Sequence, residues 1–470
     1  NTNHSIMKSL FYRFLLLFLV ISFFLACSGG SDTPDTPLLE APQLMGSTPT
    51  NGATDVSASN ISIVLTFNQN VTAPTTGHDK ITLSGATITS VLAYLTKVTI
   101  EVTGLEKGKT YTLRIPEGVI LGPSKVEAPE ISISFTTSSP QQISNKLCTT
   151  NPLTQAQNVY DFLIANYGTK IVSGTMASDS WNVNEAEWVF KHTGKYPALN
   201  GFDYGHLYAS PANWIDYGNT TIIENWWNNH GLVAATWHWN VPKSSGSTEY
   251  GFYYTGKNSG KGETSFDISK AVQDGTSENQ IVKADLAKIA DYLLLLKAKN
   301  IPVIWRPLHE AAGGWFWWGA KGATSFKALW KLMFETFQSK GINNLIWVWT
   351  SETGDEDWYP GDAYVDIVGR DVYNKTLASQ SVEEFRKLST TYSHKLITLS
   401  ECGNVSKISL QWSASANWSW FMPWYDYSRT NKMDDPAFNE TSHQFANIEW
   451  WKDALNTEAV LSRDEMPDLR

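Results

Sequence analysis

Two glutamates stand at the ends of hydrophobic segments and carry the chemistry that this sequence suggests. Glu310 closes the segment IPVIWRPLHE, and Glu401 closes the segment KLITLSE. Paired carboxyl groups among aromatic side chains suit cleavage of a glycosidic bond, because one can protonate the leaving oxygen while the other attacks or stabilises an oxocarbenium-like centre. The pair therefore predicts an enzyme that hydrolyses a glycan.

The surroundings of Glu310 favour the role of general acid. The segment AAGGWFWWG follows it and brings Trp315 and two further indoles close. A carboxyl group that loses water among indoles has a raised pKa and stays protonated. The alternation of side chains along a strand would place Arg306, Leu308 and Glu310 on one face. A purely structural ion pair between Arg306 and Glu310 is therefore the alternative.

The sequence that begins at His309 partly resembles a metal-binding motif. HEAAG begins like the zinc-protease motif H-E-x-x-H, but Gly313 stands where the second histidine is required. The motif fails, and we expect neither a metal nor another cofactor.

Four more residues at predicted strand ends accompany Glu310. Glu401, in TLSECGN, can act as a nucleophile if neighbouring hydrogen bonds keep it ionised. His238 in TWHWN, Tyr373 in GRDVYN and Trp424 in WFMPWYDY end three other hydrophobic segments. Each of these three could instead be a buried structural residue. Their common location at strand ends favours a shared site.

Composition limits the kind of partner. The net charge is −10 and the isoelectric point is near 5.4, which argues against nucleic acid, a partner that requires a basic surface. The chain holds 21 Trp, 19 Tyr and 20 Phe. Aromatic rings stack on sugar rings, although we expect most of them to lie in the core.

The N-terminus has the pattern of a targeting segment. Met7 begins a basic stretch, the apolar stretch Leu15–Leu25 is short for a membrane span, and Cys27 follows a small residue. This resembles a bacterial lipoprotein signal, with residues 1–26 removed and Cys27 as the site of lipid attachment. The alternative is an ordinary cleaved signal peptide. Residues 27–40 are expected to be a flexible tether to the outer membrane or the cell surface.

Residues 41–137 show short alternating segments, such as Ile61–Phe67, with Gly, Asn and Pro turns between them. They predict an all-β sandwich, and TPTNGATDVSASNISIVLTFNQNV and ISISFTT resemble a bacterial Ig-like domain. Such domains commonly act as spacers. Residues 138–150 are predicted to form a linker.

Residues 151–470 alternate between strand and helix patterns. Eight strand candidates begin near residues 170, 197, 231, 302, 344, 365, 395 and 417. Helical patterns separate many of them, including 282–300 and 325–340. The pattern predicts an α/β fold, a (β/α)₈ TIM barrel, whose site lies at the C-terminal strand ends. Cys148 and Cys402 could form one disulfide, but a buried thiol is the expected state of Cys402.

The segment WRPLHEAAGGWFWWG, with GRDVYN and SECG in order and spacing, resembles glycoside hydrolase family 26 over roughly residues 151–469. The resemblance implies Glu310 as acid/base, Glu401 as nucleophile, His309 as a support of Glu310, and Tyr373 as a hydrogen-bond donor to Glu401. It also implies sugar subsites lined by His238, Trp315 and Trp424. Ala311 and Ala312 depart from the more usual HEMNGG type, which bears on subsite contacts rather than on the chemistry.

The resemblance implies a retaining endo-β-1,4-mannanase whose partner is a β-mannan-type polysaccharide. A β-1,3-xylanase or a mixed-linkage β-glucanase is the alternative within the family. A non-catalytic glycan-binding lipoprotein is the alternative outside the enzyme class, and the presence of both glutamates disfavours it. We expect a monomer that is held at the membrane by its lipid.

Overall fold

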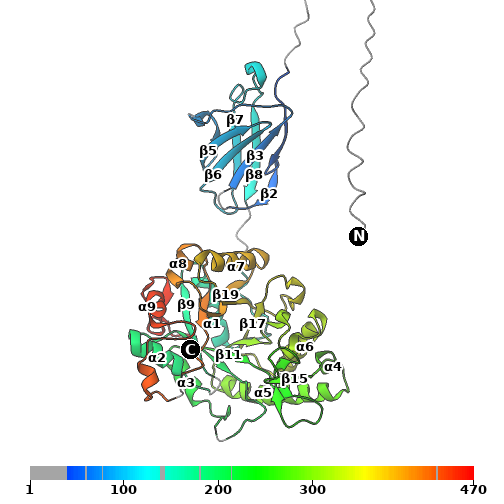
Figure 1. Cartoon of the computed structure of the whole chain (residues 1–470), viewed down its shortest axis with the longest axis vertical. Coiled ribbons are helices and arrows are strands. Elements are labelled where there is room, and N and C mark those ends of the chain that lie inside the picture. The colour runs from blue at the N-terminus through cyan, green and yellow to red at the C-terminus, as the bar shows by residue number, and fades with distance from the viewer. Residues whose placement is uncertain are drawn as a thin grey trace, which may run out of the picture. The chain divides into compact units, whose positions relative to one another are not determined.

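The computed structural model describes residues 40–470, apart from 59–60, 77, 138–142, 179–180, 213 and 430–431. The predicted signal peptide and the lipid site Cys27 lie outside the described residues. The chain divides into two compact units at residue 140, inside the predicted linker (Figure 1). No helix among the described residues is long and apolar enough to cross a membrane.

The first unit is an all-β sandwich of two four-stranded sheets. One sheet has the order β1 (Leu44–Thr48), β3 (Ile61–Phe67), β6 (Lys97–Thr103), β5 (Thr87–Tyr94), and the other has the order β2 (Ala53–Val56), β8 (Ile131–Thr137), β7 (Thr110–Ile115), β4 (Thr82–Leu83). Alternate residues such as Leu65, Ile100 and Leu113 are fully buried between the sheets. The predicted Ig-like sandwich is confirmed.

The second unit contains a closed barrel of eight parallel strands, as predicted. The strands are β9 (Ile171–Met176), β10 (Leu199–Asp203), β11 (Leu232–Trp237), β16 (Val303–Pro307), β17 (Leu345–Ser351), β18 (Ile367–Tyr373), β19 (Leu396–Gly403) and β20 (Trp420–Pro423). Each strand pairs in parallel with its neighbours, and the pairing of β9 with β10 closes the barrel. A short strand, β21 (Val460–Leu461), also pairs with β9.

Helices surround the barrel (Figure 1). They are α1 (Thr154–Asn166), α2 (Asn184–Thr193), α3 (Thr221–Asn228), α4 (Ile268–Ala271), α5 (Ser277–Ala298), α6 (Ala323–Ser339), α7 (Ala378–Thr391), α8 (Ile408–Ser413) and α9 (Ile448–Asn456). The predicted helices at 282–300 and 325–340 correspond to α5 and α6. Between β11 and α4, a long loop contains the short strands β12 (Val241–Pro242), β13 (Tyr250–Gly251), β14 (Tyr253–Tyr254) and β15 (Glu263–Thr264).

Barrel strands are buried on both faces, which explains why they appear in the sequence as nearly continuous apolar segments. Every residue of β17 is buried, including Trp347 and Trp349. Many of the indoles are therefore core residues, as expected. Cys402 is a buried free thiol in β19, and Cys148 is also free and partly exposed.

Candidate active site

Strand β16 ends three residues before Glu310, at Pro307. Leu308 and Glu310 have left-handed backbone conformations, with φ of 51° and 52°. The prediction that Glu310 continues the alternation of β16 is therefore wrong, because left-handed residues turn the chain out of the strand. Glu310 instead stands immediately before a short 3₁₀ turn, Ala311–Gly313. Non-glycine residues in this conformation are uncommon and cluster at functional sites.

The tryptophans after Glu310 divide into two groups. Trp317 and Trp318 are fully buried and donate to backbone oxygens, at 2.7 Å to Trp239 and at 2.9 Å to His309. They hold the loop in place. Trp315 instead donates from Nε1 to Oε2 of Glu310 at 3.0 Å. The indole of Trp315 therefore orients the carboxyl group directly.

The loop also folds closely onto itself at Gly319. A Cβ atom at this position would lie 1.8 Å from the backbone oxygen of Ala311, which is far inside any real contact. Only glycine fits here, because the second 3₁₀ turn, Trp317–Gly319, packs directly on the turn that follows Glu310.

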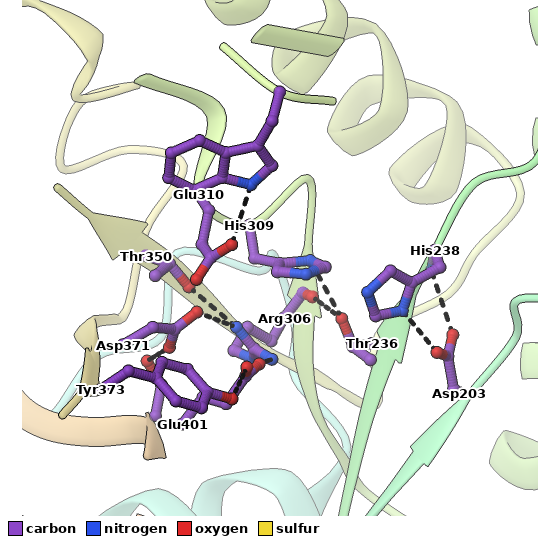
Figure 2. Close-up of polar contacts among 12 residues, drawn as sticks. Asp203, Thr236, His238, Arg306, His309, Glu310, Thr350, Asp371, Tyr373 and Glu401 are labelled. Carbon is purple, nitrogen blue, oxygen red and sulfur yellow. Dashed lines mark hydrogen bonds and ion pairs between the residues drawn. The ribbon is translucent and has the colours of Figure 1, made fainter. Parts of the chain in front are cut away.

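Arg306 lies beneath the site and binds two carboxylates (Figure 2). Its Nη1 contacts Oδ2 of Asp371 at 2.9 Å, and its Nη2 contacts Oε2 of Glu401 at 2.6 Å. All three side chains are almost fully buried. The alternative ion pair between Arg306 and Glu310 is therefore replaced by a different network, in which Arg306 binds Glu401.

Glu401 lies within β19, and Tyr373 is the last residue of β18. The Tyr373 hydroxyl donates to Oε1 of Glu401, so each oxygen of Glu401 has its own donor. One carboxylate oxygen each of Glu310, Asp371 and Glu401 lies within 4.8 Å of the others. Such a cluster could hold a cation, but the guanidinium of Arg306 already supplies positive charge to two of its members.

The two glutamates differ in the balance of charges around them. Burial, together with the charges of Asp371 and Glu401, raises the pKa of Glu310 far above its usual range. Burial and Asp371 also raise the pKa of Glu401, but Arg306 and the Tyr373 hydroxyl oppose them, so its rise is smaller. As pH increases, Glu401 therefore loses its proton before Glu310 does.

His238 directly follows β11 and is held by Asp203, the last residue of β10. Asp203 accepts from the His238 backbone N–H at 3.0 Å and contacts Nδ1 at 2.5 Å. Burial alone would lower the pKa of His238, but the carboxylate outweighs it and raises the pKa. Asp203 therefore fixes the orientation of the His238 ring.

The ring of His309 is fully buried on the same side of the site. Its Nδ1 lies 3.4 Å from Oγ1 of Thr236, and its ring contacts that of His238 at 4.7 Å (Figure 2). Burial and the charge of Arg306 lower the pKa of His309 well below its usual range, so the ring is neutral. These contacts place the ring of His309 beside Thr236 and His238.

Trp424 follows β20 directly and is buried, with its ring 5.7 Å from that of His238. The structure therefore brings together all seven residues that the sequence suggested for chemistry or sugar binding: His238, His309, Glu310, Trp315, Tyr373, Glu401 and Trp424.

Three residues of the site were not predicted from the sequence. Asp203 and Asp371 lie at or near the ends of β10 and β18. Glu401 was predicted because it is a carboxylate at the end of a hydrophobic segment, and the same criterion would have identified these two aspartates. Tyr253 could not have been found in this way, because it comes from the long loop after β11. Its ring packs on Phe316 at 5.4 Å, and Glu310 and Glu401 are close enough to raise its pKa, after the effect of burial.

Residues 148–447 match the family model described as "Glycosyl hydrolase family 26", which covers more than half of the chain. The chain belongs to glycosyl hydrolase family 26. Residues 39–137 match the model of a bacterial Ig-like domain. The resemblances to family 26 and to a bacterial Ig-like domain are thus confirmed.

Relatives within family 26 include a mannan endo-1,4-β-mannosidase of Thermothelomyces thermophilus. It is 35% identical over 304 residues, which are 63% of this chain and 61% of the relative. A mannan endo-1,4-β-mannosidase B of a Piromyces species is 31% identical over 67% of this chain and 52% of its own length. The chain thus spans roughly half to three fifths of these relatives.

Two solved structures are similar to the barrel unit of this chain. The family 26 domain of an endo-β-mannanase/endo-β-glucanase from Prevotella bryantii is 36% identical, with a TM-score of 0.62, over 69% of this chain and 99% of that domain. A β-mannanase from a symbiotic protist of the termite Reticulitermes speratus, solved with a gluco-manno-oligosaccharide, is 35% identical, with a TM-score of 0.60, over 70% of this chain and 99% of its own.

Proposed function

We propose that this chain is a retaining endo-β-1,4-mannanase in which Glu401 is the nucleophile and Glu310 the acid/base. The observation that supports this most is the short spacing of two carboxylates with unequal surroundings. An oxygen of Glu310 lies within 4.8 Å of an oxygen of Glu401. Retaining glycosidases hold these groups about 5–5.5 Å apart, whereas inverting ones need about 6.5–9.5 Å for a water.

In the first step, a Glu401 oxygen bonds to the anomeric carbon while the bond from that carbon to the glycosidic oxygen breaks. Glu310 gives its proton to the departing oxygen. Arg306 and Tyr373 favour the ionised form of Glu401 before attack. The products of this step are a glycosyl ester of Glu401, a shortened chain with a new hydroxyl group, and an ionised Glu310.

In the second step, Glu310 takes a proton from water, the water oxygen bonds to the anomeric carbon, and the ester bond to Glu401 breaks. Two inversions at the same carbon return the original configuration. Both carboxyl groups then recover their starting protonation states, so the cycle closes without a cofactor.

The substrate class rests on the relatives. Those described above carry mannan endo-1,4-β-mannosidase or β-mannanase in their names. The rings of His238, Trp315 and Trp424 around the carboxylates suit the binding of a neutral sugar. We assign to these three residues the lining of the subsites nearest the scissile bond.

The decisive experiment presents the purified protein with glucomannan, galactomannan, β-1,3-xylan and lichenan. Early release of mixed-length oligosaccharides from the first two substrates supports endo-mannanase activity. Activity on xylan or lichenan alone would assign a different substrate, and inactivity on all four would favour a glycan-binding role. NMR of the first-formed reducing ends should show the β anomer; the α anomer would exclude retention.

We also propose that the protein is a lipoprotein anchored at the outer membrane or cell surface through Cys27, with the Ig-like domain as a spacer. The support is the basic and apolar sequence before Cys27 and the polar segment after it. Full-length protein should be found in the membrane fraction and label with a fatty-acid analogue. The Cys27→Ser variant should be soluble and unlabelled; membrane retention of that variant would contradict the proposal.

A further inference from the structure

An arc of aromatic rings borders the Glu401 side of the site. Most of it belongs to the β20–α9 loop, residues 424–447. Successive rings of the arc approach each other to between 5.2 and 5.7 Å, in the order His238, Trp424, Tyr425, Tyr427, Phe445, Tyr373. The arc thus begins at a histidine of the site and ends at the tyrosine that donates to Glu401.

Tyr427 is the exposed member of this arc. It is 61% exposed, whereas Trp424 beside it is 6% exposed. Burial raises the pKa of its hydroxyl, and the nearby charges of Glu401 and Glu310 raise it further. Its aromatic ring therefore meets solvent near the reacting groups, where a ring can stack against a sugar.

The barrel order indicates which part of a substrate would meet Tyr427. A recess of about 250 Å³ over the ends of β17 and β18 is lined by Glu310, Trp315 and Glu352, and it extends to Tyr373, the last member of the arc. The β20–α9 loop leaves from the strand on the other side of β19. Because Glu310 protonates the departing oxygen, the recess faces the leaving sugar. Tyr427 then faces the part of the chain that remains bound to Glu401.

A buried ionic cluster behind the arc holds this loop at both ends. Glu185, on α2, contacts Nε of Arg429 at 3.1 Å and Nε2 of His443 at 2.8 Å. It also accepts from the backbone N–H of Asp426 at 3.3 Å. The guanidinium of Arg429 stacks on Trp188, 4.1 Å from the ring centre. One carboxylate thus joins the start and the end of the loop.

The second nitrogen of His443 fixes the backbone beside Phe445. Its Nδ1 accepts from the backbone N–H groups of Phe445 at 2.9 Å and Ala446 at 3.0 Å. A nitrogen that accepts carries no proton, so the proton is on Nε2 and is donated to Glu185. The carboxylate of Glu185 therefore orients the imidazole, and the imidazole orients the chain that carries Phe445 against Tyr427.

We propose that Tyr427 is a stacking platform for a sugar beyond the one attacked by Glu401, and that Glu185 is the positioning residue that holds this platform. The inference deepens the proposed function and rests on it for the direction of the chain. It assigns roles to two residues that lie outside the catalytic pair.

Steady-state kinetics on soluble galactomannan test the platform. Loss of one stacked ring should raise KM about tenfold in Tyr427→Ala and leave kcat within about twofold, because stacking holds the sugar equally before and during the reaction. Tyr427→Phe should keep the wild-type KM. A fall in kcat without a change in KM would overturn the platform, as would wild-type kinetics in Tyr427→Ala.

A double-mutant cycle tests the positioning role. Glu185→Ala should reproduce the KM increase of Tyr427→Ala, and the double variant should lose little more than either single variant, because both act through the same ring. Glu185→Gln, which keeps one acceptor, should be intermediate. Losses that multiply in the double variant would show that Glu185 acts elsewhere.

Matched controls separate this role from general damage. Glu187, also on α2, accepts from the Tyr196 hydroxyl at 2.9 Å, so Glu187→Ala removes a carboxylate from the same helix. Leu410, 54% exposed on α8, serves as an exposed apolar control in Leu410→Ala. Both controls should keep the wild-type KM, and circular dichroism should show every variant folded.

Binding without turnover keeps this inference separate from the proposed activity. In a Glu401→Ala background, calorimetry with mannohexaose, cellohexaose and xylohexaose identifies the glycan that binds. Tyr427→Ala should weaken that binding about tenfold, whichever hexaose it is. Unchanged affinity overturns the platform even if mannan is cleaved. Weakened affinity for a hexaose other than mannohexaose supports the platform while the proposed substrate fails.

Discussion

The guanidinium Nη2 of Arg306 lies 2.6 Å from Oε2 of Glu401, with 5% and 8% of the two side chains exposed. Its other terminal nitrogen, Nη1, contacts Asp371 at 2.9 Å, so the guanidinium makes two hydrogen bonds in fixed directions. A compact ammonium group cannot reproduce this planar arrangement. The position of Glu401 thus depends on the shape of its partner as well as on its charge.

Arg306→Lys is expected to lower kcat on mannan by about 100-fold, because Glu401 loses a directed donor while the site keeps its net charge. Steady-state kinetics would measure this. Arg114→Lys is the matched control, since Arg114 pairs with Glu130 on the surface of the Ig-like domain, and it should change nothing. Equal effects of the two substitutions would contradict the role of Arg306.

The two glutamates should respond differently to removal. Glu401→Ala should abolish activity on every substrate. Glu310→Ala should lose about 10²–10⁴-fold on polysaccharide but much less on an aryl glycoside with a good leaving group, which needs little protonation. The measurement is kcat/KM on both kinds of substrate. A loss by the same factor on both would show that Glu310 is not the general acid.

Tyr373→Phe should move the acidic limb of the pH profile to higher pH. The Tyr373 hydroxyl lowers the pKa of Glu401 by stabilising its ionised form, so its removal lets that pKa rise. Glu401 would then be protonated, and inactive, at a pH where the wild type is still active. The dependence of kcat/KM on pH reports this group in the free enzyme. An acidic limb that stays in place would show that Tyr373 only packs there.

Trapping the covalent intermediate should lower the pKa of Glu310. Besides burial and Asp371, the charge of Glu401 raises that pKa, and an ester at Glu401 has no charge. A 2-deoxy-2-fluoro glycoside would form the stable ester, and ¹³C NMR of labelled glutamate would follow the titration of Glu310. Glu310→Gln identifies the signal. A pKa that does not fall would mean that the two carboxyl groups are not coupled.

Removal of the Ig-like domain should leave turnover of soluble mannan unchanged. The two compact units separate at residue 140, and every residue of the site lies beyond it. A truncated protein that begins at Ser144 and the mature full-length chain should share one kcat/KM on soluble substrate. A large loss in a protein still folded by circular dichroism would give the domain a part in the site.

Much of the fold could be predicted because barrel strands are buried on both faces and appear as apolar segments. Glu401 and Tyr373 were placed correctly for the same reason, since both belong to strands that continue to their positions. The expected alternation of side chains along β16 does not extend to Glu310, because the left-handed residues Leu308 and Glu310 take the chain out of the strand.

Other parts of the site depend on contacts between distant segments. Nothing local joins Arg306 to Asp371, which is 65 positions away, or brings Tyr253 to the carboxylates from a long loop. The cluster of Glu185 and His443 spans 258 positions. Pairings of this kind follow from the closed barrel and the packing of its loops, and one sequence alone does not contain them.

The close approach of Gly319 to Ala311 makes the position of Glu310, the proposed acid, depend on a residue outside the catalytic pair. An alanine at position 319 would push the two turns apart, and one of them is the turn that directly follows Glu310. Such a substitution would resemble damage to the catalytic machinery while leaving each catalytic side chain intact. Substitution of Gly319 would therefore remove activity while both glutamates remain in the sequence. A related barrel with both glutamates but without glycine at this position should not be assumed to be active.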